Sequence, residues 1–108
     1  MIMLASTVPV LVAHSSNLIA VPRLSVEPSC RAASSLKLAD GQSPADCMRD
    51  EAEARKEVAR NWTSYSSAAR ARCSTEVQIG GNPSYVELYE CLDIDKRLSQ
   101  LPAEMHEK

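Results

Sequence analysis

The sequence of 108 residues has no Phe, one Trp, three Tyr and only three Gly. A chain of this length forms one small domain, and the scarcity of aromatic side chains leaves it little apolar volume to bury. Acidic and basic residues nearly balance, at 14 Asp and Glu against 12 Lys and Arg. This balance excludes a strongly basic nucleic-acid-binding protein and an acidic disordered tail. We therefore expect no nucleic-acid partner.

Charge is missing from the start of the chain, where Arg23 is the first charged residue. The apolar run Met1–Ala13 has the length of the hydrophobic part of an export signal and is too short to span a bilayer. Ala13 or Ala20 would suit a cleavage site, although no basic residue precedes the run. We interpret residues 1–20 as a signal peptide, with a buried or disordered N-terminus as the alternative. No transmembrane span is expected.

Close cysteine pairs are also missing. Zinc sites usually take two ligands from one short loop, and redox motifs use a CxxC pair. An even number of widely spaced cysteines in a small exported chain favours two disulfides, whereas four reduced, buried cysteines would indicate a cytoplasmic protein. We predict disulfides, a periplasmic or secreted location, and no metal or cofactor. The cysteines are Cys30, Cys47, Cys73 and Cys91.

Helical patterns dominate the rest of the chain. Ser43 and Pro44 suit the cap and first position of a helix, and the following segment is rich in Ala, Glu, Arg and Lys. Its apolar residues recur at steps of three or four, which predicts a helix over about 44–64 with one buried face. Glu51 is the polar exception on that face. The other members of the stripe are Cys47, Ala54, Val58, Trp62 and Tyr65.

Serine-rich sequence near residues 64–66 predicts a bend or break, with a continuous helix to Cys73 as the alternative. Further helices are expected over about 66–76 and 84–99, separated by the Gly80–Asn82 loop. Residues 21–42 contain two prolines and a Gly, which favour an irregular arm, although CRAASSLKL is compatible with a short helix. Residues 102–108 are expected to be a frayed tail. The predicted fold is an all-α, disulfide-braced bundle of two to three helices within residues 43–101.

Helix geometry restricts the disulfide pairing. Cys47 and Cys73 are 26 residues apart, or about 39 Å along one straight helix. A sharp reversal near residues 64–66 would still leave them about 15 Å apart along the axis, beyond the reach of a disulfide. Two connectivities stay open, which are Cys30–Cys47 with Cys73–Cys91 and Cys30–Cys73 with Cys47–Cys91.

Three segments carry a family resemblance. They are SCRAA, CMRDEAEARKEVARNW and GGNPSYVELYECLDI, in this order, with a Tyr, an Arg and a Cys between the last two. Together they resemble a family of small exported proteins of rhizobia and related alphaproteobacteria, which has a CxxDExxAR-type helix and a PSYVEL-x-x-CL segment. Tyr89 and Glu90 stand where the family usually has a small or apolar pair. The resemblance implies export and four family cysteines, and it implies no activity.

Catalytic groups are hard to assign in this sequence. The two histidines, His14 and His106, lie in the signal-like segment and the tail. The acidic residues of the 44–64 helix are better explained as solvated partners of nearby bases, such as Glu51 with Arg55 and Glu53 with Lys56. We therefore predict a protein that is not an enzyme.

The four aromatic side chains are expected to form the core where the helices over 44–64 and 84–99 meet. Tyr89 lies one position off the Leu88–Leu92 stripe, so Tyr89, with Tyr85, is also a candidate contact for a partner. The favoured function is a non-catalytic exported protein that binds another protein or the cell envelope. The alternatives are a redox-responsive thiol/disulfide protein and a cysteine-based metal-binding protein.

Overall fold

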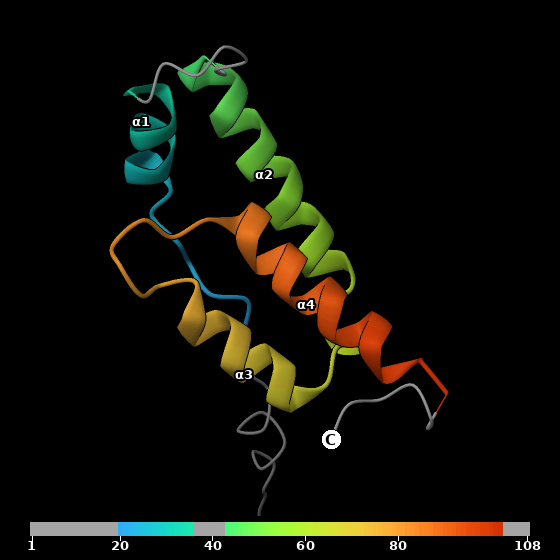
Figure 1. Cartoon of the computed structure of the whole chain (residues 1–108). Coiled ribbons are helices and arrows are strands. Elements are labelled where there is room, and N and C mark those ends of the chain that lie inside the picture. Colours follow the sequence, from blue (N-terminus) through green and yellow to red (C-terminus); the bar gives the residue numbers. More distant parts are fainter. Residues whose placement is uncertain (1–19, 36–42, 103–108) are drawn as a thin grey trace, which may run out of the picture.

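The computed structural model describes residues 20–35 and 43–102, and every regular element within them is helical (Figure 1). This confirms the predicted all-α, disulfide-braced bundle. Residues 1–19 of the predicted signal peptide and the last six residues of the predicted tail lie outside the described residues. The elements are α1 (Glu27–Ser35), α2 (Pro44–Arg60), a 3₁₀ turn η2 (Trp62–Ser64), α3 (Ser67–Glu76) and α4 (Tyr85–Ser99).

Serine side chains cap the three longer helices. The hydroxyl of Ser43 accepts from the Asp46 N–H at 3.1 Å, and that of Ser66 accepts from the Ala69 N–H at 3.0 Å. Ser84 accepts in the same way from the Glu87 N–H at 3.2 Å. Each hydroxyl satisfies an N–H that has no partner within its own helix, which fixes where the helix begins. The predicted starts are therefore correct to within one residue.

The predicted break near residues 64–66 is present, since Tyr65 and Ser66 are not helical, but the long helix ends before it. Helix α2 ends at Arg60 and not near residue 64, and η2 follows as a single 3₁₀ turn. The Asn61 side chain donates to the Glu57 carbonyl at 2.9 Å and to the Glu57 carboxylate at 3.0 Å. The side-chain bond to the carbonyl competes with the backbone N–H of Asn61, which donates to the same Glu57 carbonyl at 3.2 Å. Asn61 thus ends the helix before the serines.

The arm before α2 contains the short helix that the sequence allowed, after an irregular stretch over residues 20–26. Helix α1 begins at Glu27, ahead of the CRAASSLKL segment, and includes Pro28 in its first turn. Proline is tolerated there because the first N–H groups of a helix have no intrahelical acceptor to lose. The predicted extension of this short helix to Leu38 lies outside the described residues.

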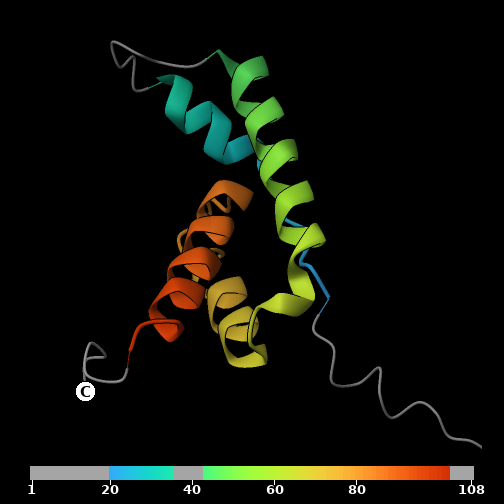
Figure 2. The same ribbon diagram turned by 90° about the vertical axis from the view of Figure 1, so that its right-hand side faces the viewer.

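The hydrophobic core lies where α2, α3 and α4 meet, while α1 sits beside the first turns of α2 (Figures 1 and 2). Cys73, Leu88, Leu92 and Val58 are its fully buried members. Between α3 and α4 the chain turns at Gly80 and Gly81, whose φ angles of 95° and 85° disfavour residues with a side chain. The core also includes Val26, Trp62, Tyr65, Ala69, Val77 and Tyr85.

Within the described part of the chain, no helix has both the length and the apolar character needed to cross a bilayer.

Candidate functional site

Two disulfides join neighbouring helices. Cys30 of α1 bonds Cys47 of α2, with the Cα atoms 5.6 Å apart, and Cys73 of α3 bonds Cys91 of α4, with the Cα atoms 5.8 Å apart. This is the first of the two connectivities left open by the sequence. The exclusion of a Cys47–Cys73 pair is confirmed. All four cysteines are oxidised, so the metal-binding alternative lacks its thiolate ligands in this structure.

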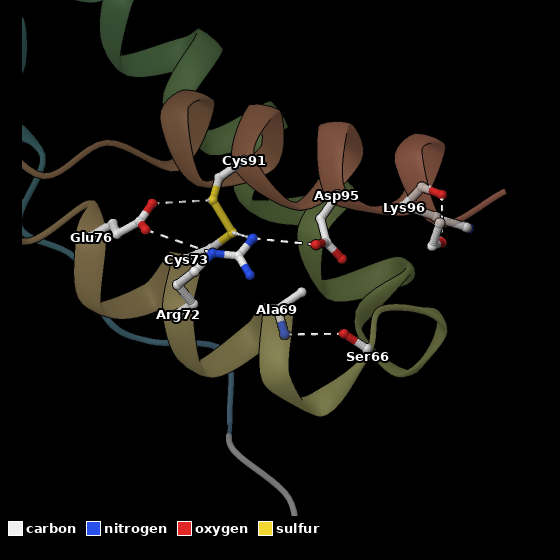
Figure 3. Close-up of polar contacts among 9 residues, drawn as sticks. Ser66, Ala69, Arg72, Cys73, Glu76, Cys91, Asp95 and Lys96 are labelled. Carbon is white, nitrogen blue, oxygen red and sulfur yellow. Dashed lines mark hydrogen bonds and ion pairs between the residues drawn. A yellow bond between two sulfur atoms is a disulfide. The ribbon is translucent and has the colours of Figure 1, made fainter. Parts of the chain in front are cut away.

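The two cysteines of the Cys73–Cys91 disulfide differ in their exposure to solvent. Cys73 belongs to the core and is 0% exposed, whereas Cys91 is half-buried on the side of α4 that faces α3 (Figure 3). An incoming thiolate must reach a sulfur atom along the axis of the bond. Cys91 is therefore the sulfur open to attack, and Cys73 is the leaving sulfur.

Charged side chains surround the same disulfide (Figure 3). An Arg72 Nη2 lies 3.8 Å from the Cys73 sulfur and 3.3 Å from an Asp95 carboxylate oxygen. A Glu76 oxygen lies 3.7 Å from the Cys91 sulfur, and the other lies 3.6 Å from Arg72 Nε. A disulfide sulfur carries no hydrogen, so the Glu76 contact is an approach of a carboxylate to the sulfur. The positive charge lies beside Cys73 and the negative charge beside Cys91.

The Cys30–Cys47 disulfide has simpler surroundings. Both cysteines are buried, but neither belongs to the cluster of side chains that forms the core. Cys30 is the only buried residue of α1. This disulfide therefore attaches a helix that has almost no hydrophobic surface in contact with the rest of the molecule.

Glu51 is an exception to the expectation that the acidic residues of α2 are exposed to solvent. It is only 5% exposed, and its carboxylate accepts from the Ser84 hydroxyl and from the Tyr85 N–H, each at 2.6 Å. The prediction of an ion pair with Arg55 is wrong, because the carboxylate points to the start of α4. An anion at a helix N-terminus is stabilised by the helix dipole and by N–H groups without an intrahelical acceptor. Glu51 therefore ties α2 to α4.

Arg55 contacts an aromatic ring, and the nearby Glu53 and Lys56 pair with each other. The Arg55 guanidinium lies over the Tyr85 ring, 5.8 Å from its centroid. The predicted pair of Glu53 with Lys56 is confirmed as a long exposed contact of 3.9 Å. Such exposed pairs contribute little to stability.

The two tyrosines proposed as partner contacts lie in different environments. Tyr85 is buried, and its hydroxyl donates to the Pro22 carbonyl at 2.7 Å and accepts from the Leu24 N–H at 2.9 Å. Tyr89 is half-buried and packs against the core. A role in partner binding stays a prediction for both, and Tyr89 is the more exposed of the two.

An exposed apolar stripe on α4 was not identified from the sequence. Ile94 and Leu98 are 57% and 56% exposed, and Leu101 is exposed in the turn after the helix. The spacing of four residues places Ile94 and Leu98 on one face of α4, away from the buried face of Tyr85, Leu88 and Leu92, and Leu101 follows just after the helix. The spacing is visible in the sequence, but the side of α4 that packs inward had to be known before the stripe could be separated from the core.

Arg70 is a second feature that the sequence did not reveal. It is buried, its guanidinium lies 5.6 Å from the centroid of the Trp62 ring, and one Nη donates to the Trp62 carbonyl at 3.4 Å. The aromatic face attracts the cation and shields it from water. Arg70 therefore belongs to the packing around Trp62.

Burial also changes the ionisation of Tyr65. Loss of water around its hydroxyl raises the pKa of Tyr65 above its ordinary value, and the nearby Tyr89 and Asp93 add to the effect. On the surface of α2, hydrogen bonds from Arg60 and Asn61 lower the pKa of Glu57.

Among the described residues, no group of three or more potential metal ligands comes together. A scan against protein-family models and searches of curated proteins and of solved structures gave no match for the chain.

Proposed function

We propose that this chain is a small exported protein that acts by binding another protein through the exposed apolar stripe of Ile94, Leu98 and Leu101. The stripe carries the proposal, because aliphatic side chains aligned on the outer face of a helix are a common means of protein recognition. The two disulfides support a periplasmic or secreted location, since such bonds persist in oxidising compartments. The family resemblance supports the same location.

The charges beside the stripe favour a protein over a lipid surface. Asp93 and Asp95 flank Ile94, and each is already in an ion pair, with Arg97 at 2.9 Å and with Arg72 at 3.3 Å. A polar, nearly neutral rim around an apolar centre is typical of protein interfaces. An anionic membrane would instead require a surplus of basic residues beside the stripe.

The test is a pull-down from periplasmic extract with the oxidised protein, comparing wild type with the double variant Ile94→Glu/Leu98→Glu. We expect at least one protein that wild type captures and the double variant does not. Ile79→Glu is the matched control, because Ile79 is 73% exposed but lies outside the stripe. A capture profile that is the same for all three proteins would contradict the proposal. A wild-type dimer that the double variant abolishes would instead identify a second copy as the occupant, which would also contradict it.

A second candidate function, thiol–disulfide exchange, is favoured by Arg72 beside the Cys73 sulfur, while Glu76 beside the Cys91 sulfur would repel an incoming thiolate. An external dithiol would attack the Cys91 sulfur, break the S–S bond and release Cys73 as a thiolate beside Arg72. The second thiol of the reductant would then displace Cys91, leaving an oxidised reductant and a reduced protein. Stabilisation of the leaving thiolate accelerates exchange.

This candidate predicts that Arg72→Gln slows reduction of Cys73–Cys91 by dithiothreitol several-fold, while the Cys30–Cys47 disulfide is unaffected. Mass spectrometry after rapid alkylation gives both rates in one sample. The control is Arg49→Gln, since Arg49 pairs with Asp46 at the start of α2 and is remote in sequence from both Cys73 and Cys91. Equal slowing by both variants would show an effect of net charge alone and remove this candidate.

A further inference from the structure

A hollow of about 450 Å³ opens between the arm before α1 and the junction of α2 with α4. Arg23, Leu24, Arg55 and Tyr85 line it. Two of these side chains are cationic and two are largely apolar, so the wall combines charge with a hydrophobic surface. This hollow is separate from both disulfides and from the α4 stripe.

Hydrogen bonds and stacking hold this wall in place. The Tyr85 hydroxyl binds the backbone on both sides of Arg23, at the Pro22 carbonyl and at the Leu24 N–H. Arg55 lies over the Tyr85 ring, which leaves the edge of its guanidinium available for further hydrogen bonds. The Arg55 guanidinium is therefore positioned by the Tyr85 ring, and Arg23 extends as an exposed side chain from a backbone that the Tyr85 hydroxyl holds on both sides.

Neither cation is part of an ion pair with another described residue. Among residues 20–35 and 43–102, no carboxylate lies within ion-pair distance of Arg23 or Arg55, whereas four other arginines have such partners. Glu51 is one turn before Arg55, but its two oxygens accept hydrogen bonds from Ser84 and Tyr85. The paired arginines are Arg49, Arg60, Arg72 and Arg97.

We propose that this hollow binds a phosphate monoester carried on a small apolar body. Two guanidinium groups match the charge and the fork geometry of a phosphate dianion, and each pairs with oxygen atoms through parallel N–H groups. The Tyr85 ring and the Leu24 side chain offer an apolar surface to the rest of the ligand. The same chemistry occurs in soluble phosphate esters and in lipids whose headgroup is a bare phosphate.

The first test is a titration of the oxidised full chain, labelled with ¹⁵N and held at constant ionic strength. Phenyl phosphate is the probe, and inorganic phosphate shows how much the apolar body contributes. We expect saturable shifts of the amide signals of Arg23, Leu24, Arg55 and Tyr85, with several-fold weaker binding of inorganic phosphate. Shifts that do not saturate, or that lie mainly elsewhere, would overturn the proposal.

Variants separate the site from general charge attraction. Arg23→Gln and Arg55→Gln should each weaken phenyl phosphate binding about tenfold, because each removes one charge-assisted contact. The matched control is Arg31→Gln, which removes the same charge from an exposed arginine of α1 that does not line the hollow. It should change the affinity less than about twofold, which is within the effect expected for a remote surface charge. Equal losses in all three variants would refute a specific site.

Arg55→Lys adds a test that keeps the charge. Lysine retains the cation but lacks the planar fork, so we expect a loss of affinity between that of wild type and that of Arg55→Gln. Vesicles distinguish the two sources of phosphate. Binding to vesicles of phosphatidylcholine with phosphatidic acid, lost in Arg55→Gln, would assign the phosphate to a lipid. Binding of phenyl phosphate without vesicle binding would assign it to a soluble ester. Absence of both would overturn the proposal.

Discussion

The two disulfides close loops of nearly equal length, with sequence separations of 17 and 18 residues, but they lie in different regions of the molecule. Cys73–Cys91 belongs to the body formed by α2, α3 and α4, where Cys73 is part of the core. Cys30–Cys47 lies at the other end, where α1 meets the first turns of α2 and no other residue of α1 is buried. Cys73–Cys91 reinforces a hydrophobic core, whereas Cys30–Cys47 joins two helices where there is no core between them.

This difference explains how so few aromatic side chains are sufficient. Trp62, Tyr65 and Tyr85 all contribute to one core at the centre of the body. The end of the molecule with α1 is held by a covalent bond and by a hydrogen bond of 2.5 Å from the Ser29 hydroxyl to the Pro83 carbonyl. A small domain commonly uses such a bond where a core cannot be extended.

The largest expected loss of stability comes from removing a core side chain of the body formed by α2, α3 and α4. Trp62→Ala should lower the free energy of unfolding by about 3–5 kcal/mol, because it leaves a cavity and removes the ring that packs against Arg70. Urea unfolding of the oxidised protein measures the change. Ile79→Ala is the control and should change stability by less than about 0.5 kcal/mol, since Ile79 is exposed. Unchanged stability in Trp62→Ala would contradict the placement of the tryptophan in the core.

The second prediction compares the two disulfides directly. Each one is removed by replacing both of its cysteines with alanine. The loss of chain entropy in the unfolded state is nearly the same for both bonds and is worth about 3 kcal/mol. Cys73→Ala/Cys91→Ala should show at least this loss, because it also perturbs the core. Cys30→Ala/Cys47→Ala should show a smaller loss, since α1 comes free in the native state and regains entropy there.

Hydrogen exchange shows where each pair acts. In Cys30→Ala/Cys47→Ala, the amides of α1 should lose protection while those of α3 and α4 keep it. In Cys73→Ala/Cys91→Ala, protection should fall throughout the body. Equal losses of stability with uniform exchange in both variants would show that contacts such as the Ser29–Pro83 hydrogen bond keep α1 in place without its disulfide.

The sequence was sufficient to predict much of this arrangement. The serines before α2, α3 and α4 predicted the helix starts, because a short hydroxyl side chain next to a helical pattern has a defined local function. Residue counting along α2 excluded a Cys47–Cys73 bond. The choice between the remaining connectivities depended on where α1 packs. That was not predictable from the sequence, because α1 contributes only Cys30 to the buried surface.

Glu51 shows why the rest could not be predicted. Its position four residues before Arg55 suits an exposed ion pair, yet it also lies in the apolar stripe of α2. Only the packing of α4 decides between the two, because the hydrogen-bond donors to Glu51 are more than 30 residues away in sequence, at Ser84 and Tyr85. The hollow with Arg23 and Arg55 depends on the same kind of long-range contact, made by the Tyr85 hydroxyl. Local spacing does not contain that information.

Glu51 therefore gives the third prediction, at the boundary between the two regions. Glu51→Gln should lower stability by about 1–3 kcal/mol, because a neutral amide cannot satisfy both donors as a carboxylate does and has no attraction to the dipole of α4. Glu53→Gln is the matched control on the same helix and should change stability by less than about 0.5 kcal/mol. Similar unfolding midpoints for the two variants would show that the Glu51 bonds contribute no more than a surface pair.

The smallest expected effect is a loss of stability at alkaline pH that comes from Tyr65 in the core. Burial raises the pKa of Tyr65, so the fold favours the neutral phenol over the phenolate. The contribution of this shift to stability is fully present below the ordinary tyrosine pKa of about 10 and is lost as pH rises through the higher folded pKa. Tyr65→Phe removes this contribution, so its stability should fall less than that of wild type above about pH 10. Urea midpoints measured between neutral and alkaline pH test this, and parallel curves for the two proteins would contradict it. Because Tyr65 lies in the core and α1 has no such group in contact, the variant should leave the protection of the α1 amides unchanged at neutral pH.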